Sequence, residues 1–126
     1  MEVHRSVAGS LGVVHLSDLP FETKRVYWIM DSPLDIVRGL HAHKELEQFI
    51  YCVNGKVSVL IDDGASQVNH ELFAGGPGLH ILPGCWRVLS GFAESTVLLV
   101  FASTCYEPND YIHDYQEFLS WTRRSD

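Results

Sequence analysis

Short runs of hydrophobic residues alternate with polar positions along most of this chain, and Gly, Asn, Asp or Pro bounds each run. A period of two is typical of strands with one buried face, and many such runs at short spacing favour a barrel or sandwich. We therefore predict one all-β domain over residues 1–126, with no linker inside it. The predicted strands are Leu11–His15, Lys24–Met30, Leu40–Lys44, Glu47–Val53, Lys56–Ile61, Val68–Phe73, Gly78–Leu82, Arg87–Ser90 and Thr96–Ala102.

The pair Asn54-Gly55 gives the clearest turn signal, because type I′ hairpin turns need a positive φ at both central residues. The segment Glu47–Ile61 is therefore predicted to form a hairpin. The glycine-rich segment 75–78 predicts a loop, since it cannot continue a strand.

The hydrophobic period changes near the C-terminus, after Pro108. Spacings of three and four residues predict one short amphipathic α-helix packed outside the barrel, and we interpret the segment Asp110–Tyr115 as part of that packing. The residues on the expected helical stripe are Tyr111, Ile112, Tyr115, Phe118, Leu119 and Thr122.

Composition and charge limit the classes of function that this chain can have. Hydrophobic residues make up 46% of the chain and charged residues 20%, which is ordinary for a globular domain. The net charge of −7 argues against nucleic acid or an anionic membrane as partner, because both require basic surface. The longest apolar run, Val97–Ala102, is too short to span a bilayer, and Met1–Ser10 lacks a signal-peptide core. Three widely spaced cysteines suggest no disulfide framework, so we expect a cytoplasmic protein.

Two histidines carry the strongest chemical signal. His41 and His43 are two positions apart on a predicted strand, so both side chains point to the same face. Such a pair can be scaffolding, but the enclosed interior expected of a barrel favours a ligand site. With Glu47 the pattern is His-x-His-x3-Glu, which resembles the first motif of the cupin barrels, where these residues ordinarily hold a metal ion.

The rest of a metal site is missing. Where cupins place a further histidine after a Pro-x-Gly turn, this chain has Trp86 or Arg87. A guanidinium cannot bind a metal and would repel a cation, so Arg87 favours an anionic substrate instead. His80 could substitute, but it precedes the turn. We expect no metal, while a metal-dependent cupin using His41, His43 and Glu47 remains the alternative.

The ordered set of motifs resembles the sugar 3,4-ketoisomerases, which are cupins that act on dTDP-linked 4-keto-6-deoxyglucose. The resemblance extends over nearly the whole chain. It rests on Pro20-Phe21-Glu22, Lys24-Arg25-Val26-Tyr27, Arg38-Gly39-Leu40-His41-Ala42-His43, Leu46-Glu47-Gln48, Asp62-Asp63-Gly64, Pro83 with Trp86-Arg87, Val97-Leu98-Leu99-Val100, and Asp110-Tyr111-Ile112 with Tyr115 and Phe118-Leu119.

This resemblance implies a cupin, or jelly-roll, β-barrel with one short C-terminal α-helix, assembled as a homodimer that exchanges N-terminal strands. It implies an isomerase without metal or cofactor in deoxysugar biosynthesis. The substrate would be a dTDP-4-keto-6-deoxyhexose, converted to its 3-keto isomer by histidine-mediated proton transfer through an enediolate.

The same resemblance implies site residues. The catalytic set is His41, His43 and Tyr27. A neutral imidazole, with a pKa of about 6.5, suits removal of the C3 proton, so His41 is the expected base. Tyr27 or His43 would donate a hydrogen bond to the developing oxyanion. Glu47 would orient one of the histidines. The expected substrate contacts are Arg38, Arg87 and Gln48, with Tyr51 and Trp86 as rings that stack on the thymine or the hexose.

One position departs from the family pattern. The family usually has an Arg-Gly pair before its first strand, and this chain has Ala8-Gly9. Arg5 would have to replace the lost guanidinium, or the nucleotide would bind in another pose. This departure keeps open a second alternative, a cupin that binds a sugar nucleotide without turning it over.

Overall fold

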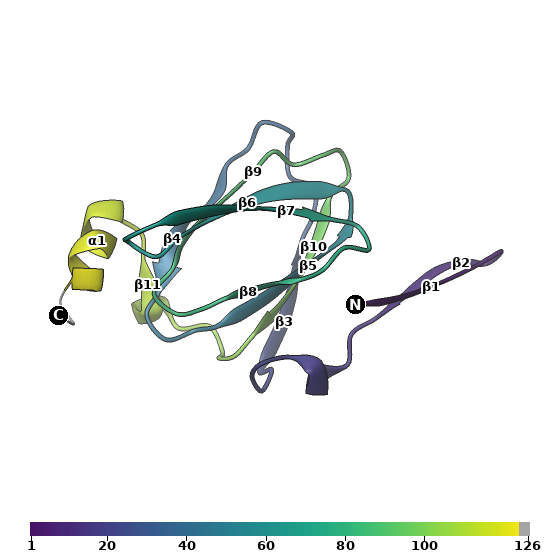
Figure 1. Cartoon of the computed structure of the whole chain (residues 1–126), viewed down its shortest axis with the longest axis horizontal. Helices are drawn as coiled ribbons and strands as arrows, with labels where there is room; N and C mark the ends of the chain where they lie inside the picture. Colours follow the sequence, from purple (N-terminus) through teal and green to yellow (C-terminus); the bar gives the residue numbers. More distant parts are fainter. Residues whose placement is uncertain (124–126) are drawn as a thin grey trace.

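The computed structural model describes residues 1–123, and the expected domain end at residue 126 lies outside them. Two antiparallel sheets face each other as a flattened barrel (Figure 1). Helix α1 (Tyr115–Arg123) covers one end, and the hairpin of β1 (Glu2–Ser6) and β2 (Gly9–Val13) projects from the other. The predicted all-β architecture with one C-terminal helix is confirmed.

Each sheet combines strands that are distant in the sequence. The four-stranded sheet has the order β3 (Arg25–Ile29), β10 (Val97–Ala102), β5 (Gln48–Asn54) and β8 (Leu79–Ile81). The five-stranded sheet has the order β11 (Tyr111–Ile112), β4 (Arg38–His43), β9 (Trp86–Ser90), β6 (Lys56–Asp62) and β7 (Gln67–Phe73).

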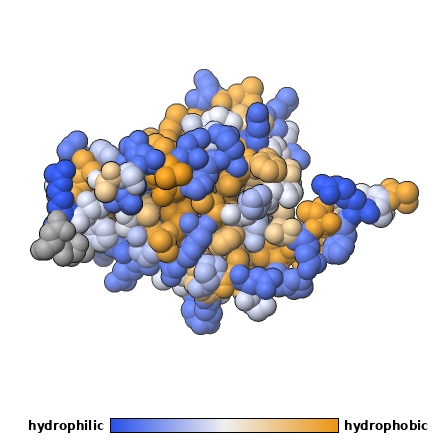
Figure 2. Space-filling model, viewed as in Figure 1, coloured by the Kyte–Doolittle hydropathy of each residue, from blue (hydrophilic) through white to orange (hydrophobic). Residues whose placement is uncertain are grey.

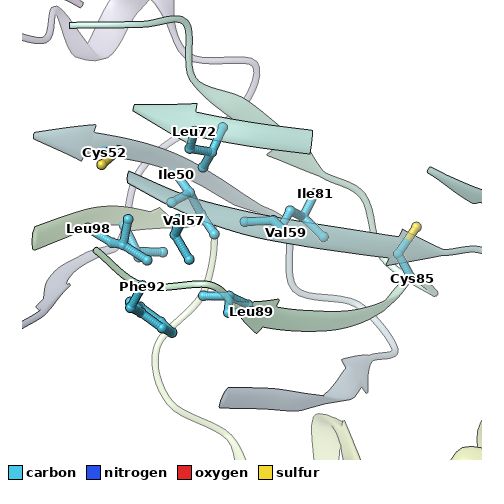
Figure 3. Packing of buried hydrophobic residues seen from close by; sticks show 11 residues of the cluster. Ile50, Cys52, Val57, Val59, Leu72, Ile81, Cys85, Leu89, Phe92 and Leu98 are labelled. Atoms are coloured by element: carbon cyan, nitrogen blue, oxygen red, sulfur yellow. The ribbon is translucent and has the colours of Figure 1, made fainter. Parts of the chain in front are cut away.

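The inner faces of the two sheets form the main core (Figure 3). Val57 and Val59 from one sheet and Leu98 and Val100 from the other have no exposed surface. Burying an aliphatic side chain of this size contributes about 1.5–3 kcal/mol, so this core fixes the distance between the sheets. The predicted hairpin Glu47–Ile61 is wrong, because β5 and β6 do not pair and belong to different sheets. Gly55 has a φ of 78°, but Asn54 is not among the residues with a positive φ, so the turn is not of type I′ and instead links the two sheets.

The helix begins later than the sequence predicted. Tyr111 and Ile112 form β11, which pairs with His43 and Ala42 at the edge of β4. They therefore do not belong to the helical stripe, because their backbone groups extend the sheet. The helix buries Phe118 against the outer face of the sheet.

The N-terminal segment forms a hairpin of two strands, of which the sequence predicted one, at Leu11–His15. The first strand, Glu2–Ser6, is mostly polar and has no buried residue, so hydrophobic alternation could not reveal it. Val7 is fully exposed at the turn, and Leu11 is 63% exposed. Figure 2 shows hydrophobic surface at the far end of this hairpin. In the described part of the chain, no helix is long and apolar enough to cross a membrane.

Candidate active site

A cavity of about 430 Å³ opens between the two sheets. Its walls combine apolar residues, among them Ile29, Ile50 and Leu89, with a dense group of polar side chains. Five of the eight residues that the sequence predicted for the site line it. The polar lining is Arg25, Tyr27, Arg38, His41, Gln48, Arg87 and Tyr111.

An irregularity in β4 aims His41 into this cavity. Gly39 and Leu40 have φ values of 82° and 54°, and the pairing of β4 with β9 shifts register between Gly39 and His41. A Cβ at Gly39 would lie 3.0 Å from the carbonyl oxygen of Arg87, so only glycine fits this approach. The bulge thereby turns the histidine that follows it.

His41 carries its proton on the nitrogen that faces the backbone. Its Nδ1 lies 2.9 Å from the carbonyl oxygen of Gly39, and a carbonyl can only accept. The neutral ring therefore leaves Nε2 as an unprotonated base. Burial, and after it the charge of Arg87, together lower the pKa of His41 to about 4. His41 is thus a neutral base at physiological pH.

His43 lies beside His41 and is almost fully buried. The two rings meet edge to face with centroids 4.9 Å apart, and the ring of Tyr111 lies 4.3 Å from that of His43. His43 Nδ1 donates to Oδ2 of Asp110 at 3.1 Å, and its buried Nε2 has no partner among residues 1–123. Burial, followed by the charges of Arg87 and His41, holds the pKa of His43 well below its usual value.

A buried guanidinium lies beside His41, on the neighbouring strand β9 of the same sheet. Arg87 is 2% exposed; its Nη1 donates to Oε1 of Gln48, and its Nη2 donates to the carbonyl oxygen of Cys85 at 3.1 Å. Nε2 of Gln48 in turn donates to the hydroxyl oxygen of Tyr27 at 2.5 Å. Burial lowers the pKa of Arg87 to about 10, so the group stays charged at neutral pH. Burial raises the pKa of Tyr27, so the phenol stays neutral.

The chain is similar to known proteins over most of its length. Residues 1–123 match the family described as FdtA, WxcM-like, C-terminal. The chain belongs to this family. It is 40% identical over 104 residues to the TDP-4-oxo-6-deoxy-alpha-D-glucose-3,4-oxoisomerase of Aneurinibacillus thermoaerophilus, an alignment that covers 82% of this chain and 75% of that protein.

Solved structures of similar proteins agree with the family over nearly the whole chain. A 3,4-ketoisomerase from Helicobacter canadensis is 38% identical, with a TM-score of 0.87 over 96% of this chain and 92% of the other. A sugar 3,4-ketoisomerase from Thermoanaerobacterium thermosaccharolyticum, solved with TDP, is 35% identical, with a TM-score of 0.89 over 98% and 91%. An epimerase from Mycobacterium tuberculosis, at 15% identity and a TM-score of 0.71, shares the fold alone. The predicted family is confirmed.

Two residues predicted to contact the substrate lie elsewhere in this family member. Trp86 packs against Phe118 and Tyr115 on the helix side of the sheet. Tyr51 lies in a separate cluster with Phe101. Residues an odd number of positions apart on a strand face opposite sides, so Trp86 does not share the cavity with Arg87, nor Tyr51 with Gln48. The structure therefore does not bring these two rings to the cavity.

Glu47 does not orient His41 or His43, contrary to the prediction. It accepts a hydrogen bond from His80 Nε2 at 2.9 Å, because the strand alternation that turns Gln48 inward turns Glu47 outward. His41, His43 and Glu47 thus do not assemble as a ligand set. No group of three His, Cys, Asp or Glu side chains within residues 1–123 is arranged to hold a metal ion.

Three residues of the site escaped sequence reasoning as functional groups. Arg25 lies two positions before Tyr27, and the period of a strand could have predicted that both face the cavity. The guanidinium carbon of Arg25 lies 5.2 Å from the centroid of the Tyr27 ring. Asp110 and Tyr111 were interpreted as helix packing, although their motif was among those that carried the family resemblance. Only the long-range contact with His43 reveals their place in the site.

Proposed function

We propose that this protein is a sugar-nucleotide 3,4-ketoisomerase that converts dTDP-4-keto-6-deoxyglucose into its 3-keto isomer during deoxysugar biosynthesis. The observation that carries the proposal is the unprotonated Nε2 of His41, which shares one cavity with the hydroxyl of Tyr27. The similar proteins support it, since a mutant of the Thermoanaerobacterium ketoisomerase was solved with TDP-4-keto-6-deoxyglucose.

The reaction begins with His41. Its Nε2 removes the proton at C3 of the hexose, and the electrons form an enediolate across C3 and C4. The proton then returns at C4, and the hydroxyl proton moves from one oxygen to the other. Because the pKa of His41 is depressed to about 4, the imidazole is available as a base but is a weak one.

The enediolate must therefore be stabilised by the cavity. Tyr27 supplies a neutral O–H donor, and the buried charge of Arg87 supplies an electrostatic field that favours an anion. Donors and charges fixed before the reaction stabilise a developing oxyanion more than water does.

His43 takes the role of a proton acceptor beside His41. With its proton on Nδ1 and shared with Asp110, neutral His43 has no hydrogen left on Nε2 to donate to an oxyanion. Donation is then the task of Tyr27, one of the two candidates predicted from the sequence.

The diphosphate binds at the open side of the cavity. Arg38 is exposed and lines the cavity, as does Arg25 at the edge strand β3. Guanidinium groups suit phosphate because they donate two parallel hydrogen bonds. In a chain with a net charge of −7, these two cations give an anionic ligand a local site.

The reaction needs no metal in this proposal. The residues His41, His43 and Glu47, which would hold one in other cupins, do not converge, because Glu47 is paired with His80. Full activity after exhaustive chelation is the expected result. Activity that follows stoichiometric iron, zinc or manganese would contradict it.

We also assign a homodimer in which each protomer lends its N-terminal hairpin to the other. Strand β3 supports this, since β10 is its one neighbour within residues 1–123 and its other edge is open. The exposed Val7 and Leu11 at the end of the hairpin supply the apolar surface that a partner would cover. Deletion of the hairpin tests this assignment.

Product analysis tests the proposed function. Incubation of the purified protein with dTDP-4-keto-6-deoxyglucose should yield the 3-keto isomer, observed by proton NMR. Tight binding of the sugar nucleotide without any isomer would overturn the proposal and favour the alternative of a binding protein.

A further inference from the structure

The chain of hydrogen bonds from Arg87 through Gln48 to Tyr27 has a fixed direction. A guanidinium has donors and no acceptor, so the amide of Gln48 must turn its Oε1 toward Arg87. The amide nitrogen then faces Tyr27 and donates to the phenol oxygen. The hydroxyl hydrogen of Tyr27 is left over, and no acceptor for it exists among the described side chains and backbone groups.

The alternative arrangement is excluded by chemistry. Rotating the Gln48 amide by half a turn would set its NH₂ group against the guanidinium, so that two donors would meet in a buried place. An unsatisfied buried donor costs about 1–3 kcal/mol, more where a charged group is involved. Arg87 cannot adapt either, because it is buried and its Nη2 is already bound to the carbonyl oxygen of Cys85.

We propose that Gln48 is a positioning residue that aims the hydroxyl proton of Tyr27 into the cavity, where the oxyanion of the enediolate forms. This inference rests on the proposed function and adds to it the reason for a glutamine. Glutamine is the residue of this size that can accept from Arg87 and donate to Tyr27 at once. The residue itself does not touch the reacting atoms in this account; it acts through Tyr27.

Replacing Gln48 with glutamate is the most informative change. The carboxylate of Gln48→Glu has the same shape but only accepts, so it would bind both Arg87 and the hydroxyl proton of Tyr27. The donor would then point away from the cavity. We expect kcat to fall about a hundredfold, as when one oxyanion donor is removed, with little change in KM. Thermal stability should not fall, because the new carboxylate also neutralises a buried cation.

That neutralisation is a second effect, and a double-mutant cycle separates it. If Gln48 acts through the hydroxyl, Gln48→Glu lowers kcat much more in the wild-type background than in a Tyr27→Phe background, where only the neutralisation of Arg87 remains. An equal loss in both backgrounds would overturn the inference, since the change would then act through the charge of Arg87. Gln116→Glu, on the exposed face of α1, is the matched control and should keep wild-type kcat.

A second variant, Gln48→Met, tests the inference independently if Gln48→Glu does not fold. Gln48→Met removes both hydrogen bonds and leaves the charge of Arg87 in place. The hydroxyl of Tyr27 then keeps its proton but loses its direction, and kcat should fall about tenfold. Unchanged kcat in this folded variant would contradict a positioning role.

A measurement without substrate keeps this inference separate from the proposed function. The ionisation of Tyr27, taken as the ultraviolet titration difference between each protein and its Tyr27→Phe counterpart, should shift to higher pH in Gln48→Glu. A hydroxyl that donates to a carboxylate loses its proton less readily. An unshifted titration would refute the direction of the hydrogen bonds even if the wild type isomerises the sugar. A wild type that makes no isomer would refute the proposed function instead.

Discussion

His43 Nδ1 donates a hydrogen bond to Asp110 Oδ2 across 3.1 Å, although the two residues are 67 positions apart. The same carboxylate accepts hydrogen bonds from the backbone nitrogens of Glu45 and Leu46, at 2.8 and 3.3 Å. Asp110 thus fixes the loop after β4 and the tautomer of a buried imidazole together. As a result, Nε2 of neutral His43 carries no hydrogen.

Asp110→Asn should therefore reverse the tautomer of His43. An asparagine can still accept from Glu45 through its oxygen, but its NH₂ would stand in place of Oδ2, lose the hydrogen bond from Leu46, and face His43 Nδ1, which forces the ring proton onto Nε2. We expect kcat to fall at least about tenfold. Nitrogen-15 NMR of the histidine rings reports the tautomer directly.

Asp114→Asn is the matched control, since Asp114 accepts from Glu117 at the start of α1 and an asparagine can do the same. It should leave both the tautomer and kcat as in the wild type. If Asp110→Asn lowers only the melting temperature and the His43 spectrum stays unchanged, Asp110 only stabilises the loop after β4, and the prediction is wrong.

The lowered pKa of His41 predicts how activity depends on pH. The base is lost by protonation, so kcat/KM should fall on the acid side with a midpoint near pH 4 and not near the ordinary pKa of 6.5. Arg87, His43, Tyr111 and His113 are charged or titratable groups around this ring. A profile with an acid limb centred at the ordinary value would contradict the buried, neutral histidine.

The free energy of unfolding should also fall as the pH is lowered, because protonation of His41 disfavours the folded state. The folded-state pKa of His41 lies below its unfolded value, so between pH 6.5 and about 4 the unfolded chain binds a proton that the folded chain does not. The contribution of this group to stability is complete above pH 6.5 and declines as the pH falls through that window. Urea unfolding of the wild type and His41→Asn over this range should converge toward low pH.

Arg38→Ala should raise KM more than it lowers kcat. Arg38 is exposed at the cavity, and a contact with the diphosphate exists in the ground state and the transition state alike. Initial rates over a range of substrate concentration separate the two constants. A variant with wild-type KM and a damaged kcat would assign Arg38 to the sugar.

Arg87→Ala makes a useful contrast. The sequence alone predicted the same result for both arginines, but Arg87 is buried and bound to Gln48 and Cys85. Its removal should lower kcat, because it acts on Tyr27 and on the charge of the enediolate. A rise in KM with unchanged kcat would instead indicate that Arg87 binds the diphosphate, as the sequence predicted.

Removing residues 1–10 should reduce dimer formation and activity together. This deletion takes away β1 and the turn that bears the exposed Val7, and with them the surface a partner would cover. Light scattering and a turnover assay on the same samples check it. A full-length chain that is monomeric at micromolar concentration and fully active would contradict the exchanged dimer, as would a truncated chain that remains a fully active dimer.

Much of this fold could be predicted because strand periodicity and turn chemistry are local. The run around Val57 alternates clearly, and a change of direction at Gly55 could be predicted, but not that this turn leads from one sheet to the other. The helix start was misplaced because Tyr111 and Ile112 fit a helical spacing and a strand equally well. Tertiary pairing with β4, which no local pattern contains, decided between them.

Strand spacing alone could bring together only residues of one strand, and Tyr27, Gln48 and Arg87, which lie on three other strands, were predicted through the family resemblance. His41 and His43 share β4, so their proximity followed from the sequence, whereas Asp110 reaches His43 through the fold. Trp86 was assigned to the site although it follows the wrong phase of β9, a mistake that strict alternation from Arg87 would have prevented.

Solvent deuterium incorporation tests the central claim most directly. The purified protein is incubated with dTDP-4-keto-6-deoxyglucose in deuterium oxide, and the product is analysed by proton NMR beside a folded His41→Asn control. We predict formation of the 3-keto isomer with wild-type His41 and a loss of at least about a hundredfold in the control, because asparagine cannot carry the proton. Near-normal turnover by the control, or binding of the sugar nucleotide without isomer and without label at C3 or C4, would contradict the account.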